Sequence, residues 1–90
     1  MTYSVEIYNE KEAQSKYADL ICTVLNEAKK RFSDFNENDF EFTQLLSTDG
    51  HLFSLLFHNK YDEDLSLSAD VFYSSADKKW IIDHIDIDQD

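Results

Sequence analysis

Proline is absent from this 90-residue sequence, and glycine and cysteine occur once each. With no proline-rich or glycine-rich linker in view, we expect a single domain, residues 1–90, with short connections. The only cysteine, Cys22, has no partner for an internal disulfide. No apolar run approaches the roughly 20 residues that span a bilayer, and the N-terminus lacks a basic segment followed by an apolar one. These absences predict a reduced, cytoplasmic setting without membrane contact.

Positive charge is also scarce. Eight Lys and Arg stand against 19 Asp and Glu, which gives a formal net charge of −11. A comfortable magnitude for a small domain is about 2 to 8, so this excess repels itself and also repels phosphate. The charge argues against nucleic acid or an anionic membrane as a direct partner. It favours basic proteins or cations, and solubility alone is the alternative explanation.

The composition nevertheless supplies a hydrophobic core. Hydrophobic residues make up 42% of the chain and include seven Phe, five Tyr and one Trp, whose side chains bury large areas. Disorder combines low hydrophobicity with high charge, and only the high charge is found here. We therefore expect a folded domain whose acidic C-terminus, residues 87–90, is the part that frays.

The N-terminal third predicts a short strand and then one long helix. Alternation in TYSVEIY, residues 2–8, puts three residues on one face: Tyr3, Val5 and Ile7. From about Glu10 to Phe32, apolar residues recur at spacings of three and four, which is typical of an amphipathic helix. Asn9 followed by Glu12 is close to a capping box and predicts where the helix begins.

Two strands, residues 40–48 and 51–59, flank Asp49-Gly50, a strong signal for a two-residue hairpin turn. A type I′ turn there pairs Thr48 with His51, Leu46 with Phe53 and Phe42 with Phe57. That register gives the hairpin one apolar face: Phe40, Phe42, Leu46, Phe53, Leu55 and Phe57.

Two further strands are expected at residues 64–73 and 80–87. The first alternates cleanly, with five residues turned inward: Leu65, Leu67, Ala69, Val71 and Tyr73. The last strand has two possible registers. One pairs Tyr73 with Ile81 and Asp70 with His84, and it turns Ile81, Ile85 and Ile87 inward together with Asp83. The other buries Trp80 and Ile82 but also His84. We favour the first.

The expected fold is α+β, with the order (β)-α-β-β-β-β. One long N-terminal helix packs on a four- or five-stranded antiparallel meander, which makes a two-layer domain.

No residues in this sequence form a recognisable catalytic or metal motif. Cys22 lacks the glycine-rich loop of a nucleophile, and His84 beside Asp70 and Asp86 is more simply a histidine in an acidic field. Asp86, Asp88 and Asp90 have the spacing that opens a calcium loop, but the required glycine and glutamate do not follow. We therefore expect no enzymatic activity, no metal site and no cofactor.

Acidic residues gather in three clusters: Asp34, Glu37, Asp39 and Glu41; Asp62, Glu63 and Asp64; and Asp83 to Asp90. Acids around an aromatic anchor are a typical composition for a tight protein contact. Our first hypothesis is an acidic inhibitor of the immunity, antitoxin or anti-defence type. It would block a basic nuclease or nucleic-acid-binding protein, in part by resembling nucleic-acid phosphates. The expected partner-binding residues are Glu37, Asp39, Tyr61, Asp62, Glu63, Asp64, Trp80, Asp86, Asp88 and Asp90.

The second hypothesis is a small homo-oligomeric or ligand-binding accessory domain. In the favoured registers the outer face of the sheet is unusually apolar, with five residues: Leu45, Leu52, Leu56, Phe72 and Ile82. A homodimer formed through this face, or coverage of it by the N-terminal segment, would explain them.

Overall fold

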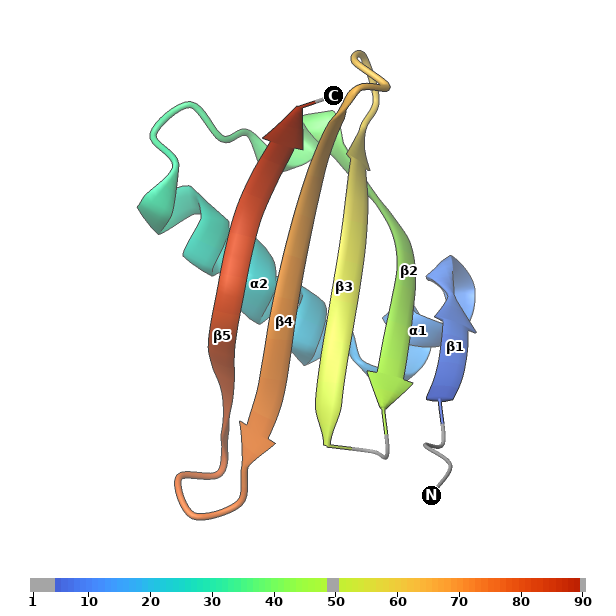
Figure 1. Cartoon of the computed structure of the whole chain (residues 1–90), viewed down its shortest axis with the longest axis vertical. Coiled ribbons are helices and arrows are strands. Elements are labelled where there is room, and N and C mark those ends of the chain that lie inside the picture. Colours follow the sequence, from blue (N-terminus) through green and yellow to red (C-terminus); the bar gives the residue numbers. More distant parts are fainter. Residues whose placement is uncertain (1–4, 49–50, 90) are drawn as a thin grey trace.

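The computed structural model describes residues 5–48 and 51–89, and in these ranges it has the expected α+β architecture. A five-stranded antiparallel sheet runs in the order β1-β2-β3-β4-β5, with the helices on one face (Figure 1). The strands are β1 (Val5–Asn9), β2 (Phe40–Thr48), β3 (Leu52–Asn59), β4 (Leu65–Ser74) and β5 (Lys79–Gln89). The helices are α1 (Glu10–Lys16), α2 (Ala18–Arg31) and the short 3-10 helix η1 (Glu37–Asp39).

The helical segment begins where the sequence predicts and breaks once. Asn9 caps α1, and its side-chain oxygen accepts a hydrogen bond from the N–H of Glu12 at 2.9 Å. The single helix expected from 10 to 32 is divided at Tyr17, whose ψ of 36° lies outside the helical region. The Tyr17 ring lies 5.3 Å from that of Phe53 and 5.4 Å from that of Tyr8. The break therefore lies where a large side chain packs between the helices and the sheet.

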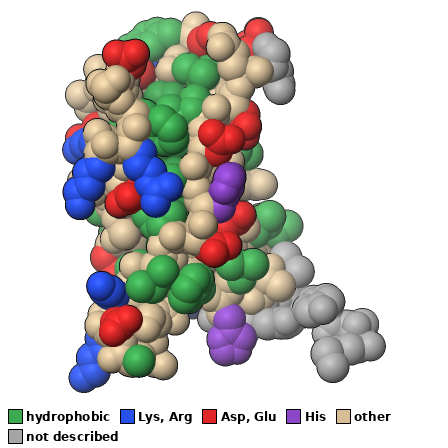
Figure 2. Space-filling view, turned by 60° about the vertical axis from the view of Figure 1, so that its left-hand side comes forward, with side chains coloured by type: hydrophobic (Ala, Val, Ile, Leu, Met, Phe, Trp, Pro, Cys, Tyr) green, Lys and Arg blue, Asp and Glu red, His purple; other side chains and the backbone are tan. Residues whose placement is uncertain are grey.

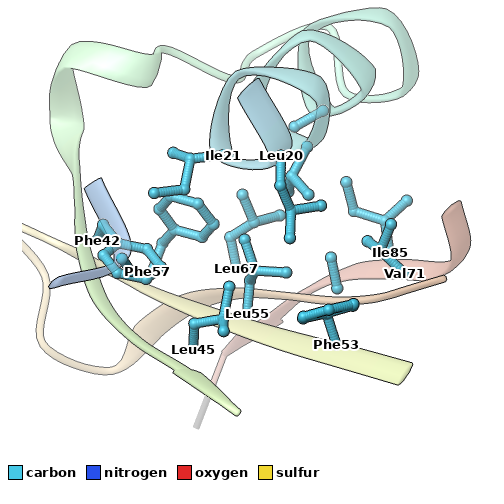
Figure 3. Packing of buried hydrophobic residues seen from close by; sticks show 14 residues of the cluster. Leu20, Ile21, Phe42, Leu45, Phe53, Leu55, Phe57, Leu67, Val71 and Ile85 are labelled. Atoms are coloured by element: carbon cyan, nitrogen blue, oxygen red, sulfur yellow. The ribbon is translucent and has the colours of Figure 1, made fainter. Parts of the chain in front are cut away.

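The core fills the space between α2 and the sheet (Figure 3). The apolar stripe of α2 supplies Leu20, Ile21, Val24 and Ala28. The sheet supplies Phe42, Leu45, Phe53, Leu55, Phe57, Leu67, Ala69, Val71 and Ile85. Each large side chain that is fully buried stabilises the fold by about 1.5–3 kcal/mol relative to an exposed one.

The β2–β3 register differs from expectation along half of its length. Phe42 pairs with Phe57, as predicted. Thr43 then forms a β-bulge, and the strand beyond it is shifted by one residue. As a result Leu45 lies in the core and Leu46 points to the opposite face, so the inward placement of Leu46 was wrong. Alternation could not reveal this, because the two neighbouring residues are equally apolar.

The same shift changes the connection between β2 and β3. Thr48 pairs with Leu52 and not with His51, whose N–H donates to the carbonyl of Thr48 at 3.1 Å. The expected two-residue hairpin connection was therefore wrong, because three residues, 49–51, separate the paired residues Thr48 and Leu52. The Asp49-Gly50 turn itself lies outside the described residues.

In the last strand the two proposed registers are each half right. Asp70 pairs with His84, as the favoured register requires. Tyr73, however, pairs with Trp80 and not with Ile81, as the other register requires. The two halves of β5 therefore follow different registers.

A β-bulge at Asp83 joins these two halves. Before it, Ile82 faces the helices, and after it Ile85 does so. Asp83 and His84 are both exposed, so neither of these side chains enters the core. Beyond the bulge, β5 stays paired with β4 as far as Gln89, which includes most of the segment that was expected to fray.

The sheet face opposite the helices is open (Figure 1). Three apolar residues expected on it are found there: Leu52, Leu56 and Phe72. Leu45 and Ile82, also expected there, are turned toward the helices by the two bulges. Leu46 and Ile81 take their places.

Candidate acidic interface

The meander brings the three acidic clusters, except for Asp83 near the middle of β5, to one end of the sheet (top of Figure 1). The start of β2 pairs with the end of β3 through Phe40 and Asn59. The start of β4 pairs with the end of β5 through Leu65 and Gln89. The segment leading into β2, the connection from β3 to β4 and the end of β5 therefore lie together. We call this region the acidic end; its acids are Asp34, Glu37, Asp39, Glu41, Asp62, Glu63, Asp64, Asp86 and Asp88.

The β3–β4 connection is held in place by local hydrogen bonds. The side-chain oxygen of Asn59 accepts from the N–H groups of Tyr61 and Asp62, both at 2.9 Å. The Asp62 carboxylate in turn accepts from the N–H of Asp64 at 3.1 Å. These Asx turns order a short acidic loop in which the residue Tyr61 is 81% exposed.

The acidic 3-10 helix is tied to the same loop. The carbonyl of Asp39 accepts from the N–H of Lys60 at 2.7 Å, and Asn36 caps η1 by accepting from Asn38 at 3.0 Å. Glu37 forms an ion pair with Lys29 of α2 at 2.8 Å. Among the described residues this is the one ion pair found for the acids of the acidic end. Most of these acids therefore have no basic side chain paired with them within the chain.

At the end of β5, Asp86 and Asp88 point to the open face. They lie opposite Ser68 and Ser66 of β4, so their cross-strand neighbours are hydroxyls and not bases. The Ser68 hydroxyl donates to Asp88 at 3.4 Å, and Asp86 accepts from the N–H of Ile87 at 2.9 Å. Alternate strand residues lie about 6.5–7 Å apart, so this pair begins a regular acidic row. Asp90, which was expected to continue it, lies outside the described residues.

A groove of about 560 Å³ opens at the same end, between the segment after α2 and the sheet. Its apolar lining is Phe32, Phe35, Phe40, Leu65 and Ile87, and Phe35 stacks on Phe40 with ring centroids 4.9 Å apart. Asp34, Asp39 and Arg31 also line the groove. Figure 2 shows hydrophobic side chains in a vertical strip, with basic and some acidic side chains on its left and acidic and histidine side chains on its right. The acidic end thus combines charge with an apolar recess.

Sequence reasoning did not find this groove. Its signal is the segment DFNENDFEF, in which three phenylalanines alternate with acids. Residues far along the chain complete the groove, and only the folded chain shows that they lie nearby.

Trp80 lies apart from the acidic end, beside the turn between β4 and β5. Its ring packs 5.2 Å from that of Phe53 and 5.1 Å from that of Tyr73. Its indole N–H donates to the carboxylate of Asp19 on α2 at 3.1 Å. The structure therefore places this expected anchor in a half-buried aromatic cluster that ties β5 to the helices, away from the other expected binding residues.

The side chains of Ser54, Asp70 and His84 are not arranged as a catalytic triad. Asp70 accepts from the Ser54 hydroxyl at 2.8 Å and lies opposite His84 on the open face. A catalytic triad would instead need histidine between the hydroxyl and the carboxylate. Within residues 5–48 and 51–89, no group of His, Cys, Asp and Glu is placed to hold a metal ion.

One side chain with a shifted pKa, that of Tyr8, lies on β1, away from the acidic end. The hydroxyl of Tyr8 donates to the carboxylate of Glu6, and this hydrogen bond raises the pKa of Tyr8. Desolvation and the neighbouring Tyr17 act in the same direction.

Comparisons with protein-family models, with curated proteins and with solved structures found no match to this chain. In the part of the chain that the structure describes, no helix has both the length and the apolar character needed to cross a membrane.

Proposed function

We propose that this protein is an acidic inhibitor of the immunity, antitoxin or anti-defence type. It binds a basic nuclease or nucleic-acid-binding protein through the acidic end and blocks the surface that holds phosphate. The observation that carries the proposal is the convergence of three separate acidic clusters on one end of the sheet. Acids that serve only solubility would not need to be concentrated at one end of the sheet.

Electrostatics supports capture of a basic partner. A chain with a net charge of −11 attracts Lys and Arg over a distance set by salt, about 10 Å at 0.1 M. Such steering raises the association rate by one to three orders of magnitude. The spacing of Asp86 and Asp88, about 6.5–7 Å, is of the same order as that of successive phosphates along a nucleic-acid strand. The acids can therefore engage several phosphate-binding groups at once.

Two apolar features supply the anchor that charge alone lacks. Tyr61 projects from the ordered acidic loop, and the groove beside it exposes the stacked rings of Phe35 and Phe40. Tight protein contacts concentrate their energy in a few aromatic anchors surrounded by polar residues. Here Tyr61 inserts into the partner, and a partner side chain enters the groove.

Charge-neutral variants test this proposal. The triple variant Asp62→Asn, Glu63→Gln and Asp64→Asn removes three charges but keeps the side-chain oxygen that accepts from Asp64 N–H. A control removes the same charge from outside the acidic end: Glu10→Gln, Asp77→Asn and Asp83→Asn. Tagged wild-type protein and both variants are incubated with host lysate, and the retained proteins are identified by mass spectrometry.

We expect one basic nuclease or nucleic-acid-binding protein to be retained by the wild type and the control and to be displaced by free DNA or RNA. With that partner purified, the triple variant should bind at least about tenfold more weakly, chiefly through a slower association rate. Equal binding by the triple variant, or an equal loss in the control, would exclude the acidic loop from the interface. Retention of only a diffuse set of basic proteins, all lost at about 0.5 M salt, would contradict the proposal.

A further inference from the structure

β5 forms one edge of the sheet and ends at the acidic end (Figure 1). It pairs with β4 on one side, and among the described residues no strand pairs with its other side. From His84 to Gln89 the pairing with β4 is continuous, because the bulge at Asp83 lies before it. We call residues 84–89 the β5 edge. An edge strand presents a row of backbone N–H and C=O groups with which another chain can pair.

One hydrogen bond shows which backbone groups of the β5 edge face outward. The N–H of Ile87 donates to the carboxylate of Asp86 at 2.9 Å, so it points to the free side and not into the ladder with β4. Along an antiparallel strand, the backbone groups of successive residues point to alternate sides. The backbone groups of Ile85 and Gln89 therefore also face outward. The Asp86 carboxylate thus occupies a donor that an added strand would use.

The side chains of the β5 edge differ between its two faces. Asp86 and Asp88 point to the open face, and Ile85 and Ile87 point to the helix side. On the helix side, the C-terminal end of α2 reaches past β5 (Figure 1), and the segment after it lines the groove together with Ile87. Figure 2, in which the β5 side is turned forward, shows a strip of hydrophobic side chains exposed on this side. A strand added here would therefore meet acids on one face and an apolar recess on the other.

We propose that the β5 edge binds an extended segment of the basic partner as a sixth strand of the sheet. For the sign of the partner's charge, this binding mode rests on the proposed function. Paired residues of neighbouring strands share a face, so the segment alternates. Its Lys or Arg side chains lie beside Asp86 and Asp88, and the apolar side chains between them turn toward the groove. Hydrogen bonds to the outward backbone groups of Ile85, Ile87 and Gln89 supply affinity, and the side chains supply specificity.

Charge distinguishes this occupant from a second copy of the chain. The β5 edge of a second copy carries acids on the same face, and like charges on neighbouring strands destabilise the pair. A basic segment turns this repulsion into attraction. When its Lys or Arg pairs with Asp86, the carboxylate leaves the N–H of Ile87, which can then donate to the added strand. Pairing of the charges and pairing of the backbones therefore occur together.

An NMR titration of the whole ¹⁵N-labelled chain with a synthetic peptide tests the sixth strand. The peptide has blocked ends and about seven residues, Lys alternating with Val, which suits the length of the β5 edge. A control peptide has the same composition with its lysines and valines in two blocks. We expect the alternating peptide to shift the amide signals of Ile85, Ile87 and Gln89 with a dissociation constant below about 1 mM. It should also slow hydrogen exchange at these amides.

Variants of the chain separate the contribution of charge from that of the backbone. The pair Asp86→Asn and Asp88→Asn keeps the side-chain oxygens and should weaken binding of the alternating peptide at least about fivefold. The pair Glu10→Gln and Asp77→Asn removes the same charge elsewhere and should bind as the wild type does. Ile87→Pro removes the outward N–H and should abolish binding. Proline is tolerated on an edge strand where the N–H faces solvent, and circular dichroism establishes that this variant is folded.

Several results would overturn the sixth strand: equal binding of the two peptides, an equal loss in the two charge pairs, or unchanged edge amides at about 2 mM peptide. Shifts of the same amides on concentrating the protein without peptide would identify a second copy as the occupant, which also contradicts the proposal. Because the probe needs no natural partner, the two proposals can fail separately. Capture of one basic protein from lysate with a negative titration would leave the inhibitor without this binding mode. A positive titration without such capture would leave the β5 edge as a site for basic segments and remove the inhibitor.

Discussion

Deleting Asp83 should leave the fold intact, whereas deleting its neighbour Ile82 should destabilise it. In the native strand, Ile82 pairs with Val71 and His84 with Asp70, and Asp83 is the extra residue between them. Without Asp83 the two pairs become consecutive in a regular strand, and every side chain keeps its face. Without Ile82, Asp83 takes its place opposite the fully buried Val71. The two deletions differ only in whether Ile or Asp faces the helices.

The expected loss in the free energy of unfolding follows from the side chains that each deletion removes or moves. Loss of the half-buried Ile82 removes about 1–2 kcal/mol of apolar burial. Moving a carboxylate against the core adds a desolvation cost of about 1–3 kcal/mol. The sum, about 2–5 kcal/mol, is a large part of the roughly 5–15 kcal/mol that stabilises a typical domain. For a chain of this length it lowers the midpoint of thermal unfolding by roughly 10 °C or more. Deletion of Asp83 should cost less than about 1 kcal/mol.

Urea and thermal unfolding, followed by circular dichroism and by the fluorescence of Trp80, measure both values. Trp80 is a suitable reporter because it packs between β5 and the helices, close to the bulge. Equal destabilisation by the two deletions would refute the placement of the bulge. So would a loss above about 2 kcal/mol on deletion of Asp83 alone.

Three other substitutions test the packing of β2 and the hydrogen bond of Tyr8 on β1. Leu45→Ala should cost about 2–5 kcal/mol in urea unfolding, because Leu45 is fully buried, whereas Leu46→Ala should cost less than about 1 kcal/mol; the reverse order would contradict the bulge at Thr43. Tyr8 has a pKa raised by its hydrogen bond to Glu6, so its contribution to stability is complete below the unfolded pKa of about 10 and falls as the pH rises beyond it. Tyr8→Phe should therefore lose less stability than the wild type between about pH 10 and pH 12 in urea unfolding, and parallel losses would contradict the assignment.

The acids of the acidic end could be predicted from the sequence, but the groove beside them could not. The clusters around Glu37 and Asp62 and at Asp86 are visible as runs of acids, and all three lie at one end once the strands form a meander. The groove is different, because Phe35 meets Leu65 and Ile87 only through pairing across the sheet. The packing of Trp80 also became visible only in the structure. An aromatic residue near a turn gives the same sequence pattern whether its side chain projects into solvent or packs against the protein.

Local pattern alone determined the element types. A three-and-four spacing with Asn9 at its start specifies the helix, and alternation specifies the strands, because both depend on neighbours within a few residues. The tertiary structure alone decided the registers at Thr43 and Asp83. Near each bulge two adjacent apolar residues, Leu45 and Leu46 or Ile81 and Ile82, fit either face, so alternation carries no information about the shift. Packing against α2 settles it, by keeping Asp83 and His84 in water while Ile82 and Ile85 both reach the core.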